Sequence, residues 1–392
     1  MNKGAKTTTI INLGPQHPST HGVLRVVLEL DGETVVSARP DIGFLHRGIE
    51  KLSEFRTYHQ IIVLTDRLDY LAAMSNNLAY VLTVEKLLGI EAPKRAQYVR
   101  VILAELQRIA SHLFWLGTHA HDLGAMTPLF YCLREREQIM DIFDTVAGSR
   151  LTPSFMRIGG LASDIDSGFD KNVVSFIRGF FDRVDEYETL LSENPIWLSR
   201  TKGIGVLPQK EYLNLGLSGP LVRAAGINWD IRKKEPYSSY GDFDFNIPQG
   251  EAGDVYDRYL VRIKEMRESA KIIDQAMAGL PEGSWTDFNL PAVFPIKSET
   301  QGNITALIRH FNLVMEGIKP PAGEVYHSIE SPRGELGFYI MSDGSPTPRR
   351  MKVRPPSFVN LQGLSRMAQG RMLSDVVGII GSIDIVLAEV DR

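Results

Sequence analysis

Two histidines four residues apart, His17 and His21, stand in the stretch GPQHPSTHG at residues 14–22. Imidazoles at this spacing could bind a metal or carry protons, but Pro18 occupies the position that is glutamate in a metalloprotease HExxH motif. Proline also prevents the helix that would place two histidines on one face. We therefore interpret the stretch as a rigid polar loop, whose histidines are either solvated or reach into a cavity.

A second group of titratable side chains lies in THAHDLGAMTP at residues 118–128. His119 and His121 point in nearly opposite directions on a helix, which disfavours a shared metal site. His119 and Asp122 share a face, and a hydrogen bond that only satisfies the core is the alternative to a functional pair. The single cysteine, Cys132, cannot form an internal disulfide or by itself hold a structural zinc or an iron–sulfur cluster.

The polar loop is positioned by strands on both sides. Residues 7–13 and 23–30 alternate and are rich in β-branched residues, and a turn leads to a third strand over residues 35–38. Pro40 then ends a small antiparallel sheet. Near the other end of the chain, residues 331–334 join a predicted hairpin of residues 325–329 and 337–341, and residues 349–353 form a further strand.

Most of the remaining chain has helical periodicity. The spacing of apolar residues predicts helices over residues 57–77, 93–116, 129–148, 169–193, 254–277 and 300–316. Tyr70 falls in the first of these helices, beside its apolar stripe. We interpret the charges of residues 254–277 as a solvated face. Residues 203–248 are rich in Gly, Tyr, Asp and Pro, and we interpret them as an irregular surface excursion.

These elements predict an α+β protein with long helices and with small antiparallel sheets in its N-terminal and C-terminal parts. We expect residues 1–45 to form the N-terminal sheet with the polar loop. Residues 46–320 are then a mainly helical core with the excursion at about residues 203–250, and residues 321–392 form a C-terminal hairpin and a terminal segment packed on that core.

Composition narrows the classes of function. The chain has 392 residues, 43% of them hydrophobic, which suffices for a large core. A net charge of −4 and the lack of a basic run argue against nucleic acid as a partner. No Gly-rich phosphate loop follows a strand, and no apolar stretch is long enough to cross a bilayer. We expect neither a secretory signal nor a transit peptide, and we expect any membrane association to run through a partner.

Several stretches together resemble one known family. They are GPQHPSTHG, GFLHRGIEKL, TDRLDY, THAHDLGAMTP, ESPRGELGFYIMSDGSPTPRRMKVRPPSF and the terminal EVDR. In this order, from about residue 10 to the end, the chain is similar to the 49 kDa subunit of NADH:quinone oxidoreductase, which is the D subunit of respiratory complex I. That family is related to the large subunits of nickel–iron hydrogenases, so the resemblance implies their helical bundle flanked by small sheets.

The resemblance assigns roles to three catalytic residues. His21 and Tyr70 match the pair that hydrogen-bonds the two sides of a quinone headgroup, and Asp122 matches the acid that partners this histidine. Reduction of a quinone to a quinol takes two electrons and two protons, and a phenol and an imidazolium are both suitable proton donors. A carboxylate beside the imidazole favours its charged form.

The electrons are expected from a partner, because one cysteine cannot make a redox chain, and this chain is expected to bind no cofactor. It places a 4Fe-4S cluster in the partner B subunit near Arg47, whose positive charge would stabilise the reduced cluster, although a structural salt bridge is the alternative. NADH is expected at a distant subunit. Other expected partners are the C subunit, the remaining peripheral-arm subunits and the membrane-arm subunits near the quinone entrance. The expected location is peripheral, on the cytoplasmic side of a bacterial inner membrane.

The related hydrogenases hold nickel with two CxxC pairs, which would fall at Asp69 with Ala72 and at Val386 with Glu389. None of these residues is cysteine, so a hydrogenase function is excluded. Two alternatives stay open: the same role in a ferredoxin-driven complex, and a scaffold subunit without a catalytic role.

One position departs from many relatives. Thr152 stands where many of them have a histidine near the partner's cluster. Without a titratable group there, we expect a lower and less pH-dependent cluster potential, which fits a low-potential quinone such as menaquinone.

Overall fold

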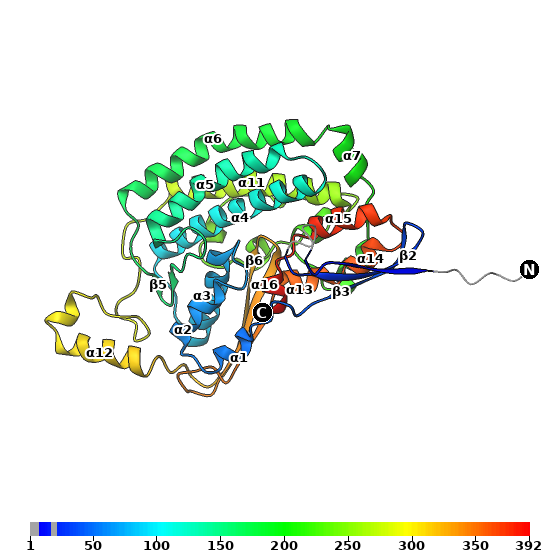
Figure 1. Ribbon diagram of the computed structural model, residues 1–392. Coiled ribbons are helices and arrows are strands. Elements are labelled where there is room, and N and C mark those ends of the chain that lie inside the picture. The colour runs from blue at the N-terminus through cyan, green and yellow to red at the C-terminus, as the bar shows by residue number, and fades with distance from the viewer. Residues whose placement is uncertain (1–7, 17–21) are drawn as a thin grey trace, which may run out of the picture.

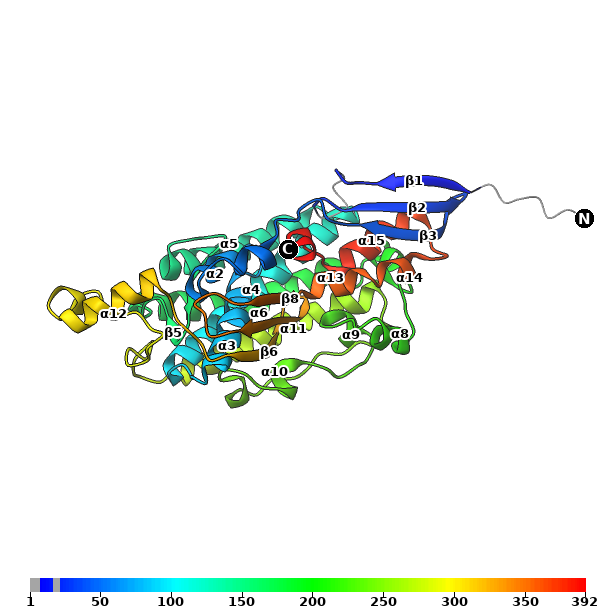
Figure 2. The same ribbon diagram turned by 90° about the horizontal axis from the view of Figure 1, so that it is seen from below.

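The computed structural model describes residues 8–16 and 22–392. Long helices form its centre, where they pack side by side (Figure 1). In both views a small sheet lies at one end of the molecule and helix α12 projects at the other (Figure 2). The central helices are α4 (Lys94–Asp122), α5 (Thr127–Ala147), α6 (Ser167–Leu191) and α11 (Val255–Ala278).

The sheet at the N-terminal end has the strand order β1-β2-β3. Its antiparallel strands are β1 (Thr9–Leu13), β2 (Arg25–Asp31) and β3 (Thr34–Asp41), with Leu13 opposite Val26. Every second residue of β2 is buried, as expected for a strand with one face on the core. The predicted sheet is confirmed, and its buried face packs in one cluster with residues of α15 (Leu373–Ile383).

The single helix predicted over residues 57–77 is wrong. The structure has α1 (Ile49–Ser53), α2 (Tyr58–Thr65) and α3 (Ala73–Leu88), with a turn over residues 66–72 between the last two. The Asp69 side chain accepts a hydrogen bond from the Leu71 N–H at 3.0 Å, and Gln107 donates to the Leu71 carbonyl at 2.7 Å. These bonds take the place of helical ones, so Tyr70 lies in a turn and not on a helix.

The other helices predicted from periodicity are confirmed, and their ends lie within four residues of the predicted ones, except that α4 continues six residues past its predicted end. Side chains cap α6 and α11 at their N-termini: Asp166 accepts from the backbone of α6, and Asp254 from that of α11. The expectation that the charges of α11 are solvated is wrong, because Arg258, Arg262 and Glu265 are buried.

The excursion predicted over residues 203–248 is also wrong, because much of this segment packs into the core. Arg223, Asp230, Arg232 and Tyr240 are each at most 1% exposed. Their polar groups are satisfied by ion pairs and hydrogen bonds with the central helices, for example between Arg232 and Glu105 at 3.1 Å. The short helices before and within it are α7 (Pro195–Thr201), α8 (Gln209–Asn214), α9 (Pro220–Ala224), α10 (Ile231–Lys234) and η2 (Tyr240–Asp242).

The predicted C-terminal hairpin is confirmed, and a third strand completes its sheet. Strands β6 (Gly323–Ser331), β7 (Gly334–Ser342) and β8 (Arg350–Arg354) pair antiparallel in this order. A two-stranded sheet of β4 (Met156–Arg157) and β5 (Gly160–Leu161) lies before α6. The remaining elements are η3 (Glu299–Gln301), α12 (Ile304–Met315), α13 (Pro356–Leu361), α14 (Leu364–Ala368) and α16 (Leu387–Asp391).

The protein is therefore α+β, as predicted, with a central bundle of long helices and small antiparallel sheets. The division into parts at residues 45 and 320 stays a prediction. Within the described ranges, no helix combines the length and the hydropathy that a bilayer crossing requires.

Candidate functional site

A cavity of about 310 Å³ opens where five chain segments meet. Its size is at the lower end of the range for small-molecule sites. Apolar side chains and a few polar groups line it together. The lining residues are Gly22, then Tyr70 and Leu71 from the turn before α3, Phe114, Trp115, Thr118, His121 and Asp122 from α4, Arg333 from the β6–β7 turn, and Asp384, Ile385 and Val386 from the segment before α16.

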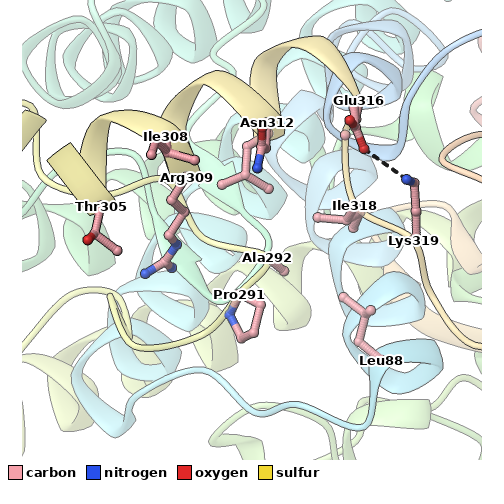
Figure 3. A pocket seen from close by; sticks show the side chains of 12 residues that line it. Leu88, Pro291, Ala292, Thr305, Ile308, Arg309, Asn312, Glu316, Ile318 and Lys319 are labelled. Atoms are coloured by element: carbon pink, nitrogen blue, oxygen red, sulfur yellow. Dashed lines mark hydrogen bonds and ion pairs between the residues drawn. The ribbon is translucent and has the colours of Figure 1, made fainter.

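A wider hollow of about 450 Å³ lies between α12 and the body of the protein (Figure 3). Its charged side chains already have partners. Glu316 and Lys319 pair with each other at 2.8 Å, and the Arg309 guanidinium donates to the backbone carbonyls of Phe288 and Val293. The cavity beside Tyr70 is the better candidate for chemistry, because acidic, basic and phenolic groups converge there.

Tyr70 is the phenol of this cavity and is 38% exposed. The turn that carries it is fixed by the Asp69 and Gln107 hydrogen bonds described above, and Asn76 also donates to the Asp69 carbonyl at 3.1 Å. Burial raises the pKa of Tyr70, and the neighbouring Asp69 carboxylate acts in the same direction. The hydroxyl therefore keeps its proton at neutral pH and can donate a hydrogen bond into the cavity.

The C-terminal end of α4 brings Asp122, which the family resemblance indicated, to the same cavity. Trp115 lies about two helical turns before Asp122. It is 1% exposed and donates its indole N–H to the Gly381 carbonyl at 2.6 Å. The His119 ring stacks on Trp115, with ring centroids 5.2 Å apart. His119 therefore belongs to the aromatic packing behind the cavity, whereas Asp122 and His121 line it.

Arg333 reaches the cavity from the two-residue turn between β6 and β7. Arg108 holds this turn by donating to the carbonyl of Ser331 at 3.0 Å. On its other side the turn packs against Gly219, where an added Cβ would lie 2.5 Å from the Arg333 carbonyl oxygen. Gly219 has φ 72°, a conformation that glycine adopts without strain, so this close approach depends on glycine.

The Arg333 side chain is buried and binds carboxylates from two other segments. It forms an ion pair with Asp69, and it pairs with the Asp384 Oδ1 at 3.2 Å. It also donates to the Ser111 hydroxyl at 3.2 Å. The planar fork of the guanidinium suits this arrangement, because several donors leave it in fixed directions.

Glu389 is a further buried acid of the cavity wall that Arg333, Asp69 and Asp384 form. It is 1% exposed and accepts a hydrogen bond from the Ser357 N–H at 3.0 Å. Burial raises the pKa of Glu389 to about 8, and the Asp69 carboxylate adds to the rise. Burial also raises the pKa of Asp69, although Arg333 opposes it. The two carboxyls are thus close enough to influence each other's ionisation.

Arg47 lies behind the cavity and does not line it. Its guanidinium donates to the carbonyl of Arg67 at 2.9 Å and to the carbonyl of Ala388 at 3.1 Å. Nearby, the Asp391 carboxylate accepts from the N–H groups of Gly43 and Leu45 at 2.8 and 2.7 Å. The GFLHRGIEKL stretch is therefore bound to the C-terminal EVDR, and Arg47 joins two of the segments that form the cavity.

The structure brings two of the three predicted catalytic residues together, because Tyr70 and Asp122 line one cavity. His21 lies outside the described residues, as does His17. Gly22, which follows His21 in the chain, is described and lines the cavity. Thr152 lies on the segment between α5 and β4 and is not part of this lining.

Metal binding has little support from the described part of the chain. No group of three or more His, Cys, Asp or Glu residues there is arranged to hold a metal ion. Cys132 is buried, and burial raises the pKa of its thiol.

Arg333, Asp384 and Trp115 were not predicted as site residues. A single arginine in a hairpin turn is usually a solvated residue, and its two acidic partners are 264 and 51 residues away. The one signal in the sequence is the family match of Asp69 and Glu389 to former metal ligands, which indicates that both residues face one central site.

Known proteins show what this chain is similar to. A family model described as the 49 kDa subunit of respiratory-chain NADH dehydrogenase matches residues 122–392. The D subunit of the NADH-quinone oxidoreductase of Geotalea uraniireducens (strain Rf4) is 55% identical over 382 residues, 97% of this chain and 98% of the relative. The D subunit of the Geobacter sulfurreducens enzyme is 54% identical over the same shares. The D 2 subunit of the Roseiflexus sp. (strain RS-1) enzyme is 55% identical over 99% of this chain and 94% of its own length.

Proposed function

Because the chain belongs to the 49 kDa subunit family of respiratory-chain NADH dehydrogenases, we propose that the cavity beside Tyr70 is the inner end of a quinone-binding chamber. The chain acts as a subunit of a proton-translocating NADH:quinone oxidoreductase, and quinone is reduced to quinol in this cavity. The observation that carries the proposal is the position of Tyr70, a partly exposed phenol in a cavity whose lining also includes Asp122 and Arg333.

The chemistry of the lining supports this function. A quinone carbonyl needs a hydrogen-bond donor, and it needs a proton once electrons arrive. Tyr70 supplies both, because its raised pKa keeps the hydroxyl protonated until the quinone oxygen becomes a strong base. His21 donates to the second carbonyl and Asp122 partners it. The position of Gly22 in the cavity lining supports this assignment, since Gly22 directly follows His21.

The electrons come from a 4Fe-4S cluster of the partner B subunit, and NADH is oxidised at a distant subunit. One buried cysteine cannot hold such a cluster, so a partner has to supply it. Arg47 is positioned behind the cavity and its positive charge favours the reduced cluster. The C subunit and other peripheral-arm and membrane-arm subunits complete the enzyme. The chain is held on the cytoplasmic side of the inner membrane through these partners.

The proposal is tested by replacing Tyr70 with phenylalanine in the assembled enzyme. Quinone reduction is measured together with electron entry from NADH to an artificial acceptor that acts upstream of the quinone. The proposed function requires the first rate to fall and the second to stay unchanged.

A further inference from the structure

The wall behind Tyr70 holds more acid than base. Asp69, Asp384 and Glu389 are each at most 5% exposed, and the Arg333 guanidinium pairs with two of them, Asp69 and Asp384. With all three carboxyls ionised, this buried wall would carry an uncompensated negative charge. Burial strongly disfavours such a charge, so the cluster is more stable with a proton on one carboxyl.

The contacts show which of these carboxyls has no cation as its partner. Asp384 accepts from Arg333 at 3.2 Å, and Asp69 pairs with another nitrogen of the same guanidinium. Glu389 accepts from the Ser357 backbone N–H and has no ion pair among the described residues. Burial and the Asp69 carboxylate both raise the pKa of Glu389. The proton is therefore held by the pair of Asp69 and Glu389, with Glu389 as its main site.

Other charged groups around the pair leave this assignment unchanged. Arg262 lies over the Trp115 ring at 4.2 Å and donates to a backbone carbonyl of Ser382. Arg47 donates to the carbonyls of Arg67 and Ala388. Both cations thus face backbone or aromatic groups, and the carboxylates that act on Arg262 are those of Asp384 and Glu265 rather than that of Glu389.

We propose that Asp69 and Glu389 hold one proton between them in the resting enzyme and return it to Tyr70 after Tyr70 has protonated a bound quinone. This step rests on the proposed function of the cavity. The Tyr70 O–H bond breaks as the quinone oxygen gains its proton. A carboxyl O–H of the pair then breaks as the phenol O–H forms again, and solvent later supplies the proton that the pair has lost. The two electrons are those that the enzyme delivers to quinone.

The direction of this transfer follows from the acidities. The pKa of Tyr70 is raised above the usual tyrosine value of 10.0, whereas that of Glu389 rises to about 8. A tyrosinate at position 70 is therefore the stronger base, and the proton moves from the pair to Tyr70. The Asp69 carboxylate acts on the Tyr70 phenol, and its partner Arg333 lines the cavity together with Tyr70.

The test replaces Glu389 with glutamine in the assembled enzyme, because an amide has the shape of a protonated carboxyl but cannot give up its proton. Infrared difference spectra should show the C=O stretch of a protonated carboxyl in the wild type and its loss in Glu389→Gln. We expect kcat for quinone reduction to fall by about tenfold, less than the loss of a direct donor would cause, with KM unchanged. Wild-type activity should decline as pH rises through the pKa of the pair, and this decline should vanish in the variant.

Two further variants make the result specific. Glu389→Asp keeps a carboxyl and should restore part of both the infrared band and kcat, and it carries the test if Glu389→Gln does not assemble. Glu335 is a partly exposed carboxyl on the hairpin that carries Arg333, and it pairs with Arg354. Glu335→Gln should change neither the infrared band nor kcat. An unchanged band or a wild-type kcat and pH profile in Glu389→Gln would overturn the proposal. A normal rate in Tyr70→Phe would instead refute the quinone site and leave the carboxyl band in place.

Discussion

At the scale of single residues, the cavity wall depends on Arg333. Its guanidinium binds Asp69 from the turn before α3 and Asp384 from the segment before α16, so one side chain links three segments. All three side chains are buried, so these ion pairs stabilise the wall only while every member is present. Removing one member of a buried ion pair leaves its partner without compensation.

Arg333→Gln should therefore destabilise the region around β6 and β7 by about 3–5 kcal/mol. Arg333 lowers the pKa of Asp69, which burial already raises above the usual 3.8, so without the cation the pKa of this carboxyl rises further. A raised carboxyl pKa makes stability fall as pH rises, so the variant should approach the wild type in acid and lose most at neutral pH. Amide hydrogen exchange of β6 and β7 in the assembled enzyme measures both effects.

The matched control is Arg350→Gln. Arg350 pairs with Glu54 at 3.1 Å, but half of its side chain is exposed. The loss of stability in Arg350→Gln should stay below about 1 kcal/mol. If both arginine variants exchange alike, Arg333 does not hold the wall as described.

At the scale of elements, the position of Arg333 is set by the turn between β6 and β7. Arg108 binds the carbonyl of Ser331 from one side, and the Gly219 backbone packs against the other. The turn is thus placed by contacts with distant segments and not by its own sequence. Its accuracy matters because a site group displaced by about 1 Å can lose much of its effect.

Gly219→Ala tests this placement. The new Cβ would lie 2.5 Å from the Arg333 carbonyl oxygen, so the turn has to move. We expect a loss of stability of about 2–4 kcal/mol, because alanine adds strain in the left-handed conformation and overpacks the contact. We also expect slower quinone reduction, because the turn carries Arg333. Gly216→Ala is the control, because φ there is 65° and the Cβ would meet only Val359 at 3.9 Å. Gly216→Ala should lose about 1–2 kcal/mol of stability and keep the wild-type rate of quinone reduction. Equal rates in the two variants would contradict the role of the turn.

Periodicity in the sequence predicted the long helices because each has a buried stripe that repeats with the helical period. It failed at residues 66–72, where apolar spacing continues through a turn. There the Asp69 side chain and Gln107 replace helical hydrogen bonds, and Gln107 is 36 residues from the carbonyl that it binds. Such tertiary hydrogen bonds leave no local pattern, so Tyr70 was assigned to a helix.

Polar composition misled the prediction for residues 203–248 in a similar way. Polar and charged residues are usually solvated, but here several are buried as ion pairs. Arg232 binds Glu105, which is 127 residues away in the chain. A sequence read locally cannot show that a charge has a buried partner, whereas the family resemblance could indicate Tyr70 and Asp122 because it does not depend on local pattern.

At the scale of the whole molecule, both ends of the chain contribute to the site. Gly22 lines the cavity from the N-terminal part of the chain, and Asp384, Ile385 and Val386 line it from the C-terminal part. Figure 1 shows α16 and the C-terminus near the centre of the molecule, where α16 contacts α13. The C-terminal EVDR is thus an internal structural element that binds residues 43–48.

Thr152→His tests the relation of this chain to the partner's cluster. If position 152 faces the cluster, an introduced imidazole should make the midpoint potential more pH-dependent, because it gains a proton as the cluster is reduced. A redox titration of the assembled enzyme followed by EPR at several pH values measures the slope. An unchanged slope would show that the imidazole and the cluster do not titrate together.

The most direct test of the central claim is quinone reductase activity per assembled complex for Tyr70→Phe. The change removes one hydroxyl and little volume, so it should cost about 1 kcal/mol of stability and leave assembly intact. If Tyr70 donates a proton to quinone, the rate should fall on the order of 10²- to 10⁴-fold while electron entry from NADH is unchanged. A purely scaffolding role would give activity that follows assembly alone. A near wild-type rate in the assembled variant would therefore contradict the assignment of the quinone site to this cavity.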